Sequence, residues 1–326
     1  MRPIALEANQ PADRFYRGGE RIARFRGATG AAEFTPEDWV GSTTSLFGDD
    51  SVGLTLLPRG ETLADAVAAD PVAWLGPEHV ARWGSDTSLL VKLLDAGERL
   101  PVHVHPDAGF GAEHLGVQHG KAEAWTMLDD AEVYVGFSRE VTADELVRWV
   151  RDQDVEQMLA AMNPLTLRAG DSLFVPARVP HAIGAGALLL EVQEPTDLSI
   201  LLEWRDFRLD GERDGHLGLG FGTALDAVDR SAWHGDRLAG LVARGLRRTG
   251  SLLPPAADRY FRVERIEVDG TSILDAGYSV IVVTDGQGTL AGLPVHAGVT
   301  ALTPHAVGRL EVAGQLTLLR CRPPAP

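Results

Sequence analysis

Short apolar runs that end at glycine, proline or aspartate recur along the first two thirds of the chain. Examples are SLLVKLLDAG at 88–97, AEAWTMLD at 122–129 and AEVYVGF at 131–137, of which the last two flank an Asp-Asp turn. The segment LTLRAGDSLFVPARVPHAIGAGALLLEVQEPT at 165–196 predicts three further strands, separated by a Gly-Asp turn and a proline-bounded loop. Many short strands with closely spaced turn signals favour a barrel or a sandwich.

Two stretches instead place apolar residues at helical spacing. The first, TADELVRWVRDQDVEQMLAAM at 142–162, begins with Thr142 as a candidate N-cap and Glu145 as its capping-box partner. The second covers 226–246 and is interrupted by glycines. TGSLLPPAAD at 249–258 is typical of a linker, and short strand patterns follow it. We therefore predict a mainly β chain with a few helices and a second, smaller β unit at its C-terminal end.

The composition restricts the classes of binding partner, but it says little about the fold. The 326 residues include 30 Lys and Arg against 46 Asp and Glu, which gives a formal net charge of −16 at pH 7. Such acidity argues against nucleic acid or an anionic membrane as a partner. The single cysteine, Cys321, excludes an intrachain disulfide, and neither a membrane-length apolar run nor the apolar core of a secretory signal is present. We expect a cytoplasmic protein. The sequence does not indicate an oligomeric state.

Three histidines are set apart by their spacing. In LPVHVHPDAGF at 100–110, His103 and His105 are two positions apart, so on a strand their side chains share one face. Two imidazoles on one face of a buried strand are unfavourable unless a divalent metal ion joins them. The pattern G-x5-H-x-H that ends at His105 is followed later by G-D-x4-P-x4-H, which ends at His181. The two patterns together predict a metal site.

These two half-motifs resemble those of the cupin superfamily, and the residues around them resemble a narrower family. HVHPDAGFGAEHLGVQHGKAEAW is similar to the Q-V-H-P-D motif, loop and G-K-T/P-E-x-W motif of the class I mannose-6-phosphate isomerases. The resemblance covers roughly residues 10 to 205, and the C-terminal β unit also has a counterpart in the family. It implies a cupin double-stranded β-barrel, or jelly roll, with a second, degenerate cupin-like β unit.

The same resemblance implies four regions along the chain. We expect an N-terminal β or irregular segment that packs on the barrel at 1–84, the metal-binding barrel with the inserted helix at 85–205, a helical linker at 206–255, and a C-terminal β unit without metal ligands at 256–326. In that last unit, LTPHAVG around His305 is similar to the loop around His181, as expected for a barrel that has lost its metal.

The match to the family also implies the ligand set. Four residues would hold the metal: His103, His105, Glu123 and His181. The alternative acid is Glu113, because in many cupins the acid closely follows the histidine pair. We favour Glu123, which stands on a predicted strand with Trp125 on the same face, whereas Glu113 lies in a glycine-rich loop. Three imidazoles and a carboxylate suit zinc, with iron, manganese or nickel as alternatives.

The remaining histidines that we weighed have no such context. We expect surface or loop positions for six of them: His79, His114, His216, His234, His296 and His305.

The implied reaction is aldose–ketose isomerisation of a small sugar or sugar phosphate. In that reaction the metal polarises oxygens, and a base moves a proton between adjacent carbons through an enediol. Lys121 matches the lysine of the family's G-K-x-E motif and, on a strand, would face the same cavity as Glu123. A partly buried lysine beside a cation is expected to have a lowered pKa, which suits either a base or an oxyanion-stabilising role.

Two departures from the family pattern concern the substrate. Pro101 stands where the family has a serine that contributes to phosphate binding, and proline offers no donor. Leu201 stands where the family has an active-site arginine, so Arg205, four residues later, is the candidate replacement. Losing both groups points away from a phosphorylated hexose, because a guanidinium is the natural partner of a phosphate.

Three interpretations therefore stay open at the level of the sequence. The first is an isomerase of this family with a shifted substrate. The second is another cupin enzyme, such as an epimerase, a lyase or an oxygenase. The third is a non-catalytic sugar-binding relative. Proton exchange, oxygen consumption, and sugar-dependent stabilisation without turnover would distinguish them.

Overall fold

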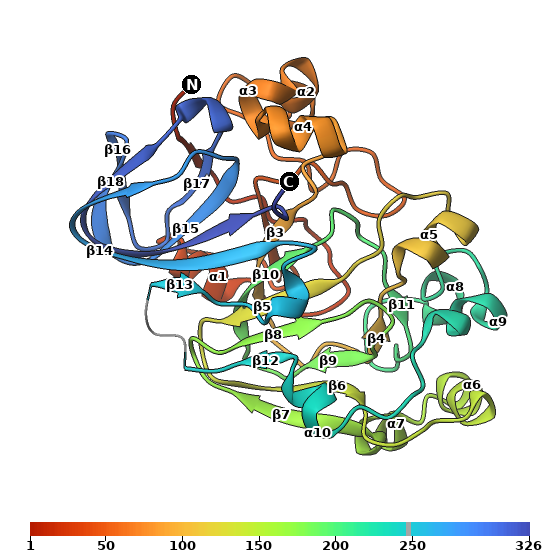
Figure 1. Ribbon diagram of the computed structural model, residues 1–326. Coiled ribbons are helices and arrows are strands. Elements are labelled where there is room, and N and C mark those ends of the chain that lie inside the picture. The colour runs from red at the N-terminus through yellow and green to blue at the C-terminus, as the bar shows by residue number, and fades with distance from the viewer. Residues whose placement is uncertain (246–248) are drawn as a thin grey trace.

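Antiparallel strands dominate the computed structural model, which describes residues 1–245 and 249–326 (Figure 1). The strands of this described part form sheets of seven, six and five members. This arrangement confirms the mainly β fold predicted from the alternation of short apolar runs and turns.

The six-stranded sheet has the order β12-β8-β5-β10-β3-β2. Its members are β2 (Glu37–Val40), β3 (Leu90–Asp95), β5 (Glu123–Met127), β8 (Ser172–Val175), β10 (Leu188–Gln193) and β12 (Val242–Ala243). Every residue of β3, β5 and β10 is buried, which explains why they appear in the sequence as mostly apolar runs. The pairing of β10 with β3 places Glu191 opposite Lys92.

The five-stranded sheet has the order β11-β4-β9-β6-β7. Its members are β4 (His103–Val104), β6 (Ala131–Phe137), β7 (Met162–Leu167), β9 (His181–Ile183) and β11 (Ile200–Leu201). Trp125 and Val192 of the six-stranded sheet belong to the same apolar core as Val133 and Ile183 of this one. The two sheets therefore pack face to face.

The C-terminal part of the chain builds the seven-stranded sheet around three long strands, in which β18 pairs with both β14 and β15. Its members are β1 (Ile4–Leu6), β13 (Gly250–Ser251), β14 (Arg262–Leu274), β15 (Ser279–Leu290), β16 (Leu293–His296), β17 (Thr300–Thr303) and β18 (Leu310–Arg322). β1 pairs with β17, so the first residues of the chain join its last sheet. Part of this sheet has a core of its own, with Ile281 and Val312 fully buried.

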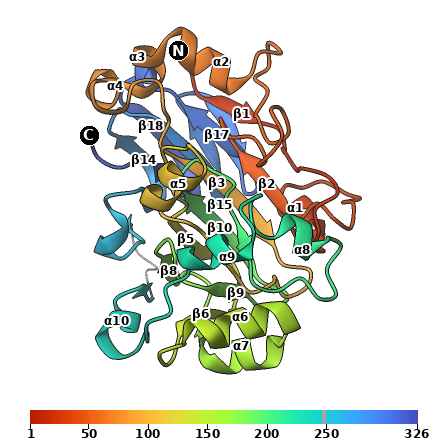
Figure 2. The same cartoon turned by 90° about the vertical axis from the view of Figure 1, so that its right-hand side faces the viewer.

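The helix predicted over 142–162 is present as two helices, α6 (Ala143–Asp152) and α7 (Val155–Ala161). Thr142 and Glu145 form the predicted capping box. The break arises because Gln153 adopts a left-handed conformation, with φ at 52°, and the next residue caps α7. Figure 2 shows both helices at the end of the molecule far from α2, α3 and α4.

The helix predicted over 226–246 is wrong for most of its length. Only η1 (Leu225–Ala227) and α10 (Gly235–Ala239) are helical, β12 follows, and residue 246 lies outside the described residues. Between the two helices, the Asp229 carboxylate accepts hydrogen bonds from the backbone and the hydroxyl of Ser231, which stabilises a turn in place of a helix.

The remaining helices are short and lie at the edges of the sheets. They are α1 (Glu20–Phe25), α2 (Leu63–Ala69), α3 (Pro71–Leu75), α4 (Pro77–Trp83), α5 (Ala108–His114), α8 (Gly211–Asp214), α9 (Phe221–Ala224), η2 (Pro255–Ala257) and η3 (His305–Val307). Within the described residues, no helix combines the length and the apolar character needed to cross a membrane.

Candidate metal centre

The three histidines singled out by their spacing meet in the core of the molecule. His103 of β4 pairs directly with His181 of β9, and His105 follows β4 by one residue. One ring nitrogen of each histidine lies within 4.8 Å of those of the other two. All three side chains are buried, with His181 fully so. Antiparallel pairing of two strands far apart in the sequence therefore brings the two half-motifs together.

Backbone carbonyls orient all three imidazole rings. The Nδ1 atoms of His103, His105 and His181 lie 2.8, 2.7 and 2.8 Å from the carbonyl oxygens of Pro101, Leu198 and Val179, respectively. A carbonyl only accepts, so each Nδ1 carries the proton and each Nε2 keeps its lone pair. The Nε2 of His181 is buried without a hydrogen-bond partner in the described part of the chain. Such an orphaned acceptor fits a metal ligand.

Glu123, the acid that the sequence favoured, lies next to the histidines. Its Oε2 lies 3.0 Å from Nε2 of His105, and its Oε1 lies 3.2 Å from Nε2 of His181. The Trp125 indole donates a 3.0 Å hydrogen bond to Oε1, which fixes the carboxylate. The alternative acid, Glu113, is on α5 with 76% of its side chain exposed. The structure thus brings Glu123, and not Glu113, to the histidines.

The charge states of these groups suit metal binding. Burial, reinforced by the neighbouring His181 and His105, holds the pKa of His103 well below its ordinary value. Burial and then the Lys121 ammonium lower the pKa of His105 to about 3. Although burial opposes it, Lys121 keeps the pKa of Glu123 well below its ordinary value. Neutral imidazoles and an ionised carboxylate are the forms that bind a metal, so these four residues fit a divalent ion.

Lys121 lies beside the candidate ligands, and its carboxylate neighbours act against the lowered pKa that the sequence led us to expect. Its Nζ lies 2.6 Å from Oε2 of Glu123, 2.8 Å from Nε2 of His105 and 3.5 Å from Oε1 of Glu191. Burial alone would lower the pKa of this lysine, but the Glu123 and Glu191 carboxylates outweigh burial and raise it. Lys121 is therefore a charged hydrogen-bond donor.

Glu191 is a polar group of the site that the sequence did not reveal. It lies within the apolar strand LLLEVQ of β10 and is buried. Burial, together with the nearby charge of Glu123, raises its pKa to about 8. A lone acid in an unbroken apolar strand was the available signal, because such a residue needs a partner inside the protein.

His103, Lys121, Glu123 and Glu191 line a cavity of about 330 Å³, a volume suited to a small ligand. Its polar lining consists of Arg14, Tyr16, Glu37, Lys92, Lys121, Glu123, Glu191, Asp197 and others. Pro101 and Leu201 belong to its apolar lining, so both departures from the family pattern do face the cavity.

Arg205 does not reach this cavity, which corrects the expectation that it replaces the missing arginine. Its guanidinium lies 3.3 Å from the Glu156 carboxylate of α7, and 46% of its side chain is exposed. Its backbone N–H donates a hydrogen bond to the Gln153 side chain, which fixes the chain direction here. The residue follows β11 outward, toward α7 and solvent, rather than inward.

The other histidines follow expectation except for one. His79 is buried on α4, where its Nε2 lies 2.6 Å from the Asp86 carbonyl, so its predicted surface position is wrong. His119, which the sequence did not single out, forms a hydrogen bond with the Asp86 carboxylate. Its Nδ1 lies 3.7 Å from the Glu194 carboxylate.

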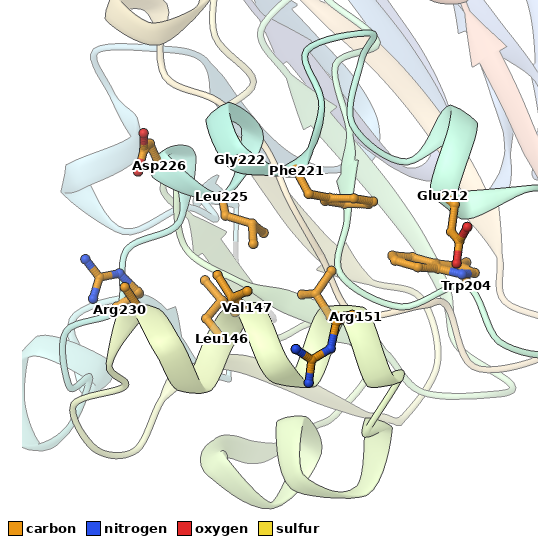
Figure 3. Close-up of a pocket in the computed structure, with 12 residues that line it drawn as sticks. Leu146, Val147, Arg151, Trp204, Glu212, Phe221, Gly222, Leu225, Asp226 and Arg230 are labelled. Carbon is orange, nitrogen blue, oxygen red and sulfur yellow. The ribbon is translucent and has the colours of Figure 1, made fainter.

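A second, larger hollow of about 570 Å³ lies between α6, α9 and the chain around Trp204 (Figure 3). Leu146, Val147 and Leu225 give it an apolar lining, and the Trp204 and Phe221 rings stack with their centroids 5.1 Å apart. None of the four candidate ligands belongs to its lining. The chemistry of the chain is therefore concentrated in the smaller cavity.

Comparison with known proteins connects this geometry to a family. No family model matches the chain. The mannose-6-phosphate isomerase of Streptococcus mutans is 26% identical over 315 residues, covering 93% of both chains. The mannose-6-phosphate isomerase ManA of Bacillus subtilis is 28% identical over 249 residues, covering 71% of this chain and 73% of that protein.

Solved structures agree with the sequence relatives. The mannose 6-phosphate isomerase from Bacillus subtilis superposes with a TM-score of 0.77 at 24% identity, covering 99% of this chain and all of that one. A mutant phosphomannose isomerase from Salmonella typhimurium gives a TM-score of 0.74 at 14% identity, with full coverage of both chains. These likenesses confirm the predicted cupin fold. The chain is thus similar to mannose-6-phosphate isomerases over most of its length and shares the fold of their solved structures.

Proposed function

We propose that this protein is a metal-dependent aldose–ketose isomerase that interconverts mannose 6-phosphate and fructose 6-phosphate. The observation that carries the proposal is the buried set of His103, His105, His181 and Glu123, with Lys121 beside it. His103, Lys121 and Glu123 line one cavity. The relatives named as mannose-6-phosphate isomerases align with this chain over most of its length, which supports the same reaction. The acidic composition supports a small-molecule substrate over nucleic acid.

Zinc is the metal that we propose for the site. Three neutral imidazoles and one carboxylate form a donor set that zinc commonly takes in proteins. The carbonyl bonds at each Nδ1 hold the rings so that the Nε2 lone pairs face one region. When bound, such an ion supplies Lewis-acid polarisation of the substrate's carbonyl and hydroxyl oxygens.

Two further side chains would handle charge and protons. The reaction removes a proton from C2 of the aldose and returns one to C1, while a proton moves from the C2 hydroxyl to the C1 oxygen. The charged Nζ of Lys121 can donate a hydrogen bond to the oxygen that gains negative charge. We assign the carbon proton to Glu191, because its carboxyl lines the cavity 3.5 Å from that ammonium.

Metal removal tests this function directly. The protein would be stripped with a chelator, reloaded with zinc, and assayed for fructose 6-phosphate formed from mannose 6-phosphate. We expect activity only in the reloaded protein. Lys121→Met should keep the bound zinc and lower kcat by about 100-fold or more, since positioned charge and proton-transfer groups contribute such factors. Turnover that survives both chelation and Lys121→Met would contradict the proposal.

A further inference from the structure

A buried cation from the N-terminal segment lines the metal cavity. Arg14 precedes α1 and has 16% of its side chain exposed, and it lines the cavity together with Phe15 and Tyr16. This arginine lies far in sequence from the motifs that build the metal centre. It therefore could not be linked to the cavity from spacing alone.

The guanidinium of Arg14 faces the Glu37 and Asp197 carboxylates, but its pairing with Glu37 is loose. Its Nε is buried without a hydrogen-bond partner among the described residues, and its terminal NH2 group lies 3.6 Å from the Glu37 carboxylate, beyond hydrogen-bond distance. Glu37 has closer partners, because it accepts hydrogen bonds from Tyr16 and from the Trp39 indole at 2.6 Å. Lys92 also lies nearer to it, at 3.4 Å. The Glu37 carboxylate therefore does not saturate the guanidinium.

The backbone holds this segment firmly in place. The N–H of Arg14 donates a 3.1 Å hydrogen bond to the carbonyl of Phe34, and the carbonyl of Phe15 accepts one from Arg208 at 3.1 Å. Gly18 follows with φ at 150° and packs against the Asp95 carbonyl so closely that a Cβ would collide with it. The backbone that carries Arg14 is thus fixed at the edge of the cavity.

The wall of the cavity has few other groups suited to an anion. Pro101 and Leu201, at the positions of the family's phosphate-binding serine and active-site arginine, are both apolar. Lys92 is engaged by Glu37, by Asp197 at 3.9 Å, and by the face of the Trp39 ring. Lys121 donates to the metal-site carboxylate. Arg14 is the lining cation whose fork of donors is least occupied.

We propose that Arg14 binds the phosphate group of the substrate and thereby takes over the role of the serine and arginine that this chain lacks. The proposal rests on the proposed function for the identity of the sugar, and it assigns specificity for a phosphorylated sugar to the N-terminal segment. A guanidinium can hold two phosphate oxygens at once, which a loose pairing with Glu37 leaves room for.

Binding of two non-reactive ligands tests this inference separately from catalysis. Isothermal titration calorimetry on the zinc-loaded protein would compare a hexitol 6-phosphate with the corresponding free hexitol. Arg14→Met should weaken hexitol 6-phosphate binding by about 10- to 100-fold, the factor that corresponds to one charge-assisted pair. Binding of the free hexitol should change by less than about twofold, because that ligand has no phosphate.

Two other variants test whether the effect depends on the guanidinium group of Arg14. Arg14→Lys keeps a charge near Glu37 but loses the planar fork, so we expect a selective loss of roughly three- to tenfold. This variant decides the question if Arg14→Met does not fold. The matched control is Arg17→Met on the same segment, where the side chain is 57% exposed and pairs with Glu33. It should leave both affinities unchanged.

The outcomes separate the inference from the proposed function. A selective loss of hexitol 6-phosphate binding supports the role of Arg14 even if the protein does not isomerise mannose 6-phosphate. That second result would contradict only the proposed function. Equal affinity of the wild-type protein for the two hexitols would overturn the inference. An unchanged preference for the phosphorylated hexitol in both Arg14 variants would also overturn it.

Discussion

His119 provides a pH-dependent test of how the segment around Lys121 is held. Its imidazole forms a hydrogen bond with the Asp86 carboxylate and lies near the Glu194 carboxylate. Glu194 in turn accepts a 2.8 Å hydrogen bond from the backbone N–H of Ala122. Replacing the imidazole by glutamine removes the positive charge from this arrangement while keeping a polar side chain.

The magnitude follows from the pKa of His119. Its hydrogen bonds with Asp86 and then Glu194 raise the pKa from 6.5 to about 9. At 1.36 kcal/mol per pH unit, a difference of about 2.5 corresponds to an upper limit of about 3.4 kcal/mol. The side chain is 24% exposed, and solvent screening reduces the expected contribution to about 1.5 kcal/mol.

The direction of the pH dependence is set by a folded-state pKa that lies above the unfolded-state value. The protonated imidazole stabilises the fold fully below pH of about 6.5, and this contribution is lost as the pH rises through about 9. We expect His119→Gln to lower Tm by about 3 °C at pH 6 and by less than about 1 °C at pH 10.

Thermal unfolding of the wild-type protein and His119→Gln at pH 6, 7.5, 9 and 10 would measure this difference. His234→Gln is the matched control, because His234 is exposed at the start of α10 and its side chain makes no capping bond. The reasoning is refuted if His119→Gln lowers Tm equally at pH 6 and pH 10, or if it lowers Tm at neither.

Three further predictions concern the site itself. His181→Ala should weaken zinc binding by at least about 100-fold, because even groups that only orient a ligand contribute 10- to 100-fold; metal analysis after dialysis would show it, and full zinc content would contradict it. Glu123→Gln should likewise lose zinc, whereas Glu113→Gln should retain it, since only Glu123 contacts the histidines; the opposite pattern would reverse our choice of acid. Arg205→Met should leave kcat/KM within about twofold, because its guanidinium pairs with Glu156 at the surface; a loss of tenfold or more in steady-state kinetics would place it back in the site.

The metal centre was predictable because its information is local. The spacing of His103 and His105 fixes a shared face on one strand, and the turn before His181 sets where the next strand begins. Glu123 could be chosen over Glu113 because a strand pattern with Trp125 differs from a glycine-rich loop. Each of these inferences depends on no more than a few neighbouring residues.

The wall of the cavity was not predictable because distant segments assemble it. Glu191 and Lys92 face one another only through the pairing of β10 with β3, and Arg14 reaches the cavity from a segment that precedes α1. Arg205 was misplaced for the same reason, since the position of α7 decides where that residue turns. Register and packing between remote elements set these contacts, and spacing within a motif does not encode them.

The same difference between local and long-range contacts decided which features of the helices could be predicted from the sequence. The capping box at Thr142 could be predicted because it needs only two residues at fixed spacing. The left-handed conformation of Gln153, which divides the predicted helix, could not be predicted from the sequence. Its side chain accepts hydrogen bonds from the backbone of Trp204 and Arg205, which are far away in the sequence. Tertiary contacts decided the break.

Proton NMR of the zinc-loaded protein with mannose 6-phosphate in heavy water tests the central claim most directly. The account predicts that solvent deuterium appears on C1 of the fructose 6-phosphate that forms, and on C2 of the remaining mannose 6-phosphate. In Lys121→Met, neither carbon should gain deuterium over the same period. A zinc-occupied protein that leaves the carbon-bound protons of mannose 6-phosphate unexchanged would contradict the assignment of isomerase chemistry to this site.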